Sequence, residues 1–107
     1  MRGTIKDILH ITGVQGYIIV TEKNIQIKLP SKHKLARAKD RIRRLYNDLA
    51  DEKQRPGNVV EIYLKDMIVT VFMNKTTMLL VLSSQRVNLA LLRMTGKLTL
   101  SNIVKEK

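Results

Sequence analysis

The 107 residues suffice for one domain, and a hydrophobic share of 44% beside 27% charged residues excludes the composition of a disordered chain. Cysteine is absent, which excludes disulfides, thiolate metal sites and cysteine nucleophiles, and the longest apolar stretch, Met67 to Met73, is far short of the roughly 20 residues that cross a bilayer. The N-terminus lacks the apolar run of a signal peptide, so we expect a cytoplasmic protein, and the net charge of +11 indicates an anionic partner, whether nucleic acid, lipid or an acidic protein.

A short helix and a hairpin are predicted at the start of the chain. Thr4 and Asp7 have the spacing of a capping box, and Gly13 is placed as a glycine just past a helix end. Residues 17–21 are mostly β-branched, and apolar and polar residues alternate over 25–29. These two runs are expected to form the antiparallel strands of a hairpin.

A long amphipathic helix is predicted from about Ser31 to Glu52. Its apolar residues recur at intervals of three and four as a narrow seam: Leu35, Ala38, Ile42, Leu45 and Leu49. The opposite side is mainly basic. We expect the seam to pack on a sheet, and a purely inter-subunit coiled coil remains the alternative.

Three strands and a helix are predicted in the second half of the chain. The strands are Val59–Leu64, Met67–Met73 and Thr76–Leu82, joined by tight turns. Asn88 can cap a helix that runs to Met94, and Gly96 and Thr99 weaken its continuation.

The character of the strands decides the fold class. The alternating run 59–64 is typical of an edge strand, whereas the two later runs are apolar on both faces and need a helical layer on each side of the sheet. Residues 1–107 are therefore expected to form one α+β domain with three layers, α/β/α, around a five-stranded antiparallel sheet. The predicted order is helix, strand, strand, helix, strand, strand, strand, helix.

Two segments resemble the Roadblock family of dynein light chains and small-GTPase regulators. Residues 8–21 contain a Gly-Val-Gln-Gly step that is similar to the Roadblock transition from its first helix into its first strand. Residues 79–82 followed by Asn-Leu-Ala-Leu-Leu-Arg at 88–93 are similar to the family's last strand and Asn-Leu-Gly-Leu-Leu-Arg helix. Asn24, Ala90 and Lys65-Asp66 stand where members usually have glycine or a glycine-containing turn, which marks a distant member.

The resemblance implies a homodimer or heterodimer that pairs through the third strand and the long helix. It also implies a scaffold for dynein components or Ras-like small GTPases, with no catalytic triad or metal common to the family. A small cysteine-free chain with an unpaired edge strand favours dimerisation as well. The expected dimer-interface residues are Val59, Glu61, Tyr63 and Leu45.

The basic side of the long helix is the predicted partner-binding surface. It carries Lys34, Arg37, Arg41 and Arg44. Like-charge neighbours on a helix cost a few tenths of a kcal/mol each, which an acidic partner such as a Ras-like GTPase would offset. The alternatives are a solvated face and a nucleic-acid-binding module acting through residues 31–47. With one Phe, three Tyr and no Trp, the chain has few residues that could stack on bases. Binding to a membrane surface is the third possibility, after a protein partner and nucleic acid.

The sequence contains no pattern that favours an enzyme, a metal or a cofactor. His10 and His33 are single and lack a neighbouring carboxylate cluster, so no metal site is predicted. A Gly-rich phosphate loop, a Gly-x-Ser-x-Gly elbow and paired carboxylates in an apolar setting are all missing from the sequence. We therefore expect a non-catalytic protein.

Overall fold

The computed structural model describes residues 3–30, 38–49, 59–74 and 76–105. The helices and strands are, in chain order, α1 (Ile5–Leu9), β1 (Val14–Val20), β2 (Ile25–Lys28), α2 (Lys39–Asp48), β3 (Val59–Tyr63), β4 (Ile68–Met73), β5 (Met78–Ser83) and α4 (Leu89–Lys105). The strands form one sheet in the order β2-β1-β5-β4-β3, and neighbouring strands are antiparallel. The predicted order of elements and the predicted edge position of β3 are confirmed.

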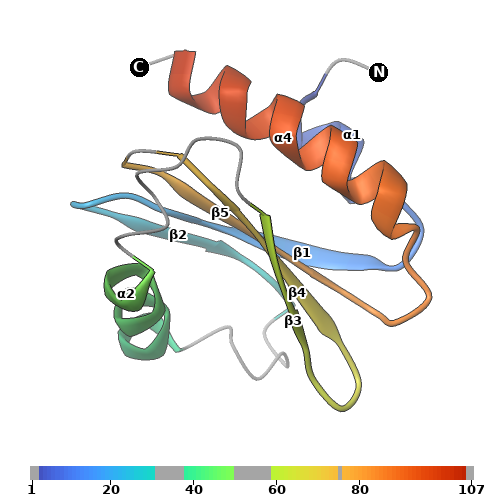
Figure 1. Ribbon diagram of the computed structural model, residues 1–107, viewed down its shortest axis with the longest axis horizontal. Coiled ribbons are helices and arrows are strands. Elements are labelled where there is room, and N and C mark those ends of the chain that lie inside the picture. The colour runs from blue at the N-terminus through green and yellow to red at the C-terminus, as the bar shows by residue number, and fades with distance from the viewer. Residues whose placement is uncertain (1–2, 31–37, 50–58, 75, 106–107) are drawn as a thin grey trace.

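Helices cover both faces of the sheet (Figure 1), with α1 and α4 on one face and α2 on the other. All residues of β4 and β5 are buried, as predicted for central strands. One core cluster joins the sheet to Ile42 and Tyr46 of α2, and a second joins it to Ile8 of α1 and Leu92 and Leu100 of α4. The three-layer α/β/α arrangement is thereby confirmed.

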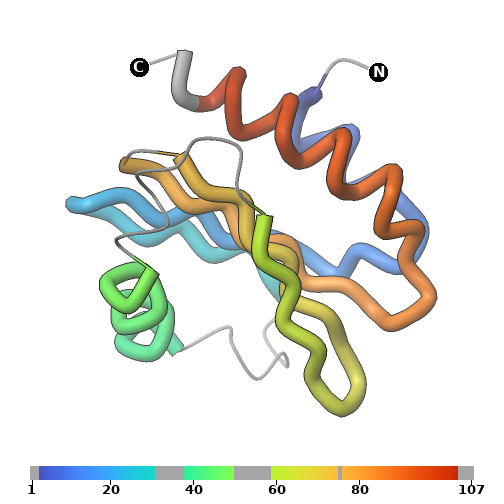
Figure 2. Tube along the Cα trace, viewed as in Figure 1, coloured from blue at the N-terminus to red at the C-terminus, as the bar shows by residue number. Residues whose placement is uncertain are grey.

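The N-terminal segment runs beside the last helix (Figure 2). Thr4 and Asp7 form the predicted capping box, with the Asp7 N–H donating to Thr4 Oγ1 at 3.3 Å and the Thr4 N–H donating to Asp7 Oδ2 at 3.0 Å. The Thr99 hydroxyl shares its hydrogen between the Thr95 carbonyl of its own helix, at 2.8 Å, and the Thr4 carbonyl, at 3.2 Å, and the second contact links the start of α1 to α4. Gly13 has φ +97°, a conformation in which a side chain would be strained.

The last helix is longer than predicted. It continues through Gly96 and Thr99 to Lys105 instead of ending near Met94. Gly96 lies so close to the ring of Phe72 in β4 that a Cβ there would overlap it, and Thr99 is buried with its hydroxyl donating to the Thr95 carbonyl at 2.8 Å. Tertiary packing therefore outweighs the weak helix propensity of these two residues.

The helix α2 is shorter than predicted within the described residues. The backbone leaves helical geometry at Ala38, which flanks the helix, and again at Leu49. The last helical residues, Asn47 and Asp48, are weak helix formers, which favours the end of the helix at this point. Of the seam, Ile42 is buried, Leu45 and Leu49 are half-buried against the sheet, and Leu35 lies outside the described residues. The prediction that this seam packs on the sheet is correct for Ile42, Leu45 and Leu49.

Candidate functional site

In the part of the chain that the structure describes, β3 has no neighbouring strand on its outer side. The Leu64 N–H donates to the Met67 carbonyl at 2.9 Å, so these residues form a hydrogen-bonded pair at the end of the β3–β4 ladder. Hydrogen-bonded and non-hydrogen-bonded pairs alternate along an antiparallel ladder. The N–H and C=O groups of Val59, Glu61 and Tyr63 consequently face away from β4, where they can accept a further strand.

The side chains of the same three residues lie on the α4 side of the sheet. Val59 packs against the core cluster beneath α4. Glu61 accepts two hydrogen bonds from Arg93 of α4, from Nε at 2.6 Å and from Nη2 at 2.8 Å, and these hold the pKa of its carboxyl below the usual value. The Tyr63 hydroxyl donates to Glu61 Oε1 at 3.3 Å, although 61% of the residue is exposed. The edge strand is thus fixed to α4 by a charged pair.

Leu45, the fourth predicted interface residue, lies on the opposite face of the sheet. It belongs to α2, which packs against β1, and its half-buried side chain contacts the other core cluster. Within one subunit the structure brings Val59, Glu61 and Tyr63 together on one strand and leaves Leu45 apart from them. A shared dimer interface for all four residues stays a prediction.

The outer face of α2 exposes part of the predicted basic surface. Arg41 and Arg44 are exposed, while Lys34 and Arg37 lie outside the described residues. Asp40 and Asp48 are exposed on the same helix, so the described part of this face is less basic than the whole predicted segment.

A neighbouring arginine has a structural role that the sequence did not reveal. Arg43 Nη1 donates to the Thr21 carbonyl at 2.7 Å, and its guanidinium lies 5.2 Å from the centre of the Tyr46 ring. Tyr46 is itself buried, and its hydroxyl donates to the Thr76 carbonyl at 2.9 Å. Burial raises the pKa of this phenol. The sequence did contain one indication that Tyr46 is buried. Tyr46 follows Ile42 by four residues, which places it on the flank of the apolar seam.

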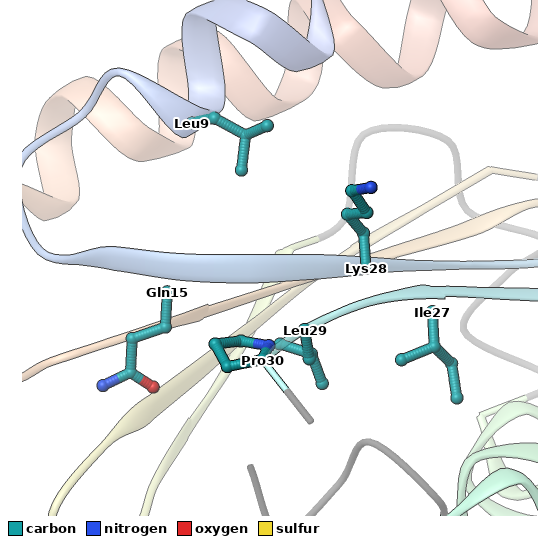
Figure 3. Close-up of a pocket in the computed structure, with 6 residues that line it drawn as sticks. All are labelled: Leu9, Gln15, Ile27, Lys28, Leu29 and Pro30. Atoms are coloured by element: carbon teal, nitrogen blue, oxygen red, sulfur yellow. The ribbon is translucent and has the colours of Figure 1, made fainter. Parts of the chain in front are cut away.

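A cavity of about 500 Å³ that is open to solvent lies beside the other edge of the sheet (Figure 3). It is lined by Leu9, Gln15, Ile27, Lys28, Leu29 and Pro30.

Within the described ranges no group of three or more His, Asp or Glu side chains is arranged to hold a metal ion. No helix among those residues is long and apolar enough to cross a membrane.

Comparison with known proteins shows structural similarity at low sequence identity. No protein-family model matches the sequence, and no curated protein matches it. The crystal structure of a Roadblock/LC7 domain from Streptomyces avermitilis superimposes with a TM-score of 0.68 over 97% of this chain and 93% of that chain, at 12% identity. The crystal structure of MglC from Myxococcus xanthus gives a TM-score of 0.60 over 98% of this chain and 96% of that chain, at 10% identity. The chain therefore has the fold of a Roadblock/LC7 domain.

Proposed function

We propose that this protein is a non-catalytic, homodimeric binding platform that regulates a Ras-like small GTPase or serves a motor or scaffold complex in the cytoplasm. The observation that carries the proposal is the free edge of β3 on a Roadblock fold, with the backbone of Val59, Glu61 and Tyr63 facing outward. The Roadblock fold itself supports a binding or regulatory role.

Pairing of two β3 strands would join two sheets into one and remove the open edge. Such pairing is the usual remedy for an edge that otherwise invites aggregation. If the two-fold axis passes near Glu61, two carboxylates approach each other on the α4 side. Arg93 neutralises each of them within its own subunit, which lowers the repulsion that like charges on paired strands would produce.

The basic face of α2 is the proposed docking surface for the GTPase. Arg41 and Arg44 are exposed and carry no ion pair among the described residues, so they are available to an acidic partner surface. Lys34 and Arg37, from the same predicted helix, are proposed to extend this surface. Charges arranged in this way mainly raise the association rate and make it sensitive to salt.

Charge reversal tests this docking surface. The double variant Arg41→Glu, Arg44→Glu should fold normally, since exposed substitutions usually change stability by less than about half a kcal/mol. The matched control is Arg86→Glu, Lys97→Glu, which makes the same change of charge at exposed sites outside α2. Binding to a Ras-like GTPase of the same organism, loaded with GTP or GDP, is followed by stopped-flow fluorescence.

The proposal predicts slower association and a weaker salt dependence for the α2 variant than for the control. Equal association rates for the two variants would contradict docking through α2. Duplex DNA serves as a second probe: loss of DNA binding in the α2 variant, with GTPase binding unchanged, would favour the nucleic-acid alternative instead.

A further inference from the structure

Among the described residues, β2 has no neighbouring strand on its outer side, so it forms the second free edge of the sheet. The Thr21 N–H donates to the Asn24 carbonyl at 2.8 Å, so these residues form a hydrogen-bonded pair at the end of the β1–β2 hairpin. By the alternation of an antiparallel ladder, the N–H and C=O groups of Ile25 and Ile27 face away from β1. An incoming strand would find two hydrogen-bonding residues here.

The apolar side chains of β2 lie on one face of the sheet and its polar side chains lie on the other. Ile25 and Ile27 are half-buried on the α2 side, where they contact the core cluster. Gln26 and Lys28 are exposed, and they pair with Ile19 and Tyr17 on the face covered by α1 and α4. Figure 3 shows the Lys28 side chain pointing toward α1 and the Ile27 side chain pointing the other way.

Two cavities lie along this strand. The larger, of about 500 Å³, brings Leu9 of α1, which is 40% exposed, together with Lys28 and Pro30 at the end of β2. The smaller, of about 190 Å³, is lined by Ile19, Thr21, Asn24, Gln26 and Ile103, and so lies toward the hairpin turn. Both ends of β2 therefore border a cavity that is open to solvent.

The positive charge at this edge indicates the chemistry of the strand that would bind there. Lys28 is exposed and has no acidic partner among the described residues, and the whole chain carries a net charge of +11. An opposite charge placed directly across from a strand residue on the same face is stabilising. A residue paired with Lys28 by an added strand would share its face, so an acidic side chain fits that position.

We propose that the edge of β2 binds an extended segment of a partner protein as an additional strand, with an acidic residue opposite Lys28 and apolar residues on either side of it. The flanking residues would point to the α2 face, where Ile27 and Leu29 offer apolar surface. Strand addition of this kind draws affinity from main-chain hydrogen bonds and specificity from alternating side chains. The site is separate from the proposed dimer contact, because β2 and β3 are opposite edges of the sheet.

A short edge strand with a lysine is also a common protection against unwanted pairing. Protection alone does not explain the two cavities beside β2 or the exposed Leu9 that faces one of them. The two explanations differ in their predicted response to peptides.

The first test is a charge exchange, measured by fluorescence anisotropy with synthetic peptides whose core is Val-Glu-Val or Val-Lys-Val. The full chain should bind the glutamate peptide, and Lys28→Glu should weaken that binding roughly fivefold while improving binding of the lysine peptide. Lys23→Glu, in the exposed turn of the same hairpin, controls for the change in net charge. Absence of saturable binding, or equal effects of Lys28→Glu and Lys23→Glu, would overturn the proposal.

The second test probes the backbone without altering the protein. Peptides are methylated on single backbone nitrogens, which removes one N–H donor at a time. Strand addition requires that methylation abolish binding at alternate residues and leave the intervening residues nearly unaffected. Equal tolerance at every position would rule out strand addition at β2. The variant Tyr63→Pro, which blocks the opposite edge, should bind the glutamate peptide as the unaltered protein does.

Discussion

Replacing Gly96 with alanine distinguishes helix propensity from packing in α4. Propensity alone predicts a gain of about 1 kcal/mol, because glycine is a poor residue inside a helix. The structure predicts a loss, because a Cβ at this position would overlap the ring of Phe72, which is only 1% exposed between the sheet and α4. Overpacking a dense core costs about 1–3 kcal/mol, and a ring overlap belongs at or above the upper end. The net loss should be about 2 kcal/mol, or roughly 10 °C in Tm.

Urea unfolding followed by circular dichroism measures this difference. Ser101→Ala, at an exposed position of the same helix, serves as the control and should be neutral or slightly stabilising. Combining Gly96→Ala with Phe72→Leu should cost less than the sum of the two single changes, since the smaller side chain leaves room for the new methyl group. A Gly96→Ala variant as stable as the unaltered protein would refute the close contact between α4 and β4.

Three further predictions concern a hydrogen bond, a charged pair and nucleotide binding. Tyr46→Phe removes the hydrogen bond to the Thr76 carbonyl and should lower the free energy of unfolding by about 1 kcal/mol in urea titrations, and no loss would argue against that bond. The pKa of Glu61 is lowered by Arg93, so the pair stabilises the fold above the ordinary pKa of 4.5, and this contribution is lost as the pH falls through the folded-state pKa. Melting curves against pH should show that decline in the unaltered protein, and a Glu61→Gln variant with the same acid-side decline would contradict it. Calorimetry with GTP and Mg²⁺ should detect no binding by the protein alone, whereas micromolar affinity would reveal a nucleotide site that the sequence did not indicate.

The sequence predicted the features that depend on local patterns. Alternation over 59–64 identified an edge strand, the Thr4–Asp7 spacing identified a helix start, and the apolar runs 67–73 and 76–82 identified buried strands, because each pattern reports the burial of its own segment. The length of α4 could not be predicted, since it depends on a contact between Gly96 and Phe72 that is distant in sequence.

The same distinction, between local patterns and contacts distant in sequence, applies to the candidate sites. The exposure of Arg41, Arg44 and Tyr63 followed from periodicity. The pair between Glu61 and Arg93 and the bond from Arg43 to Thr21 join residues 32 and 22 positions apart, so periodicity within one segment carries no information about them. Arg43 is an example: it lies within the basic segment 31–47, and its bond to the Thr21 carbonyl holds α2 against the hairpin.

The most direct test of the homodimeric platform is the mass in solution of the unaltered protein and of Tyr63→Pro. Proline at this position removes an N–H that faces outward, so no bond to β4 is lost, and the replaced residue is 61% exposed. Light scattering at micromolar concentration should give twice the 12.3 kDa of one chain for the unaltered protein and a single chain for Tyr63→Pro, which should retain its circular dichroism spectrum. A monomeric unaltered protein, or a Tyr63→Pro variant that remains fully dimeric, would contradict pairing through β3.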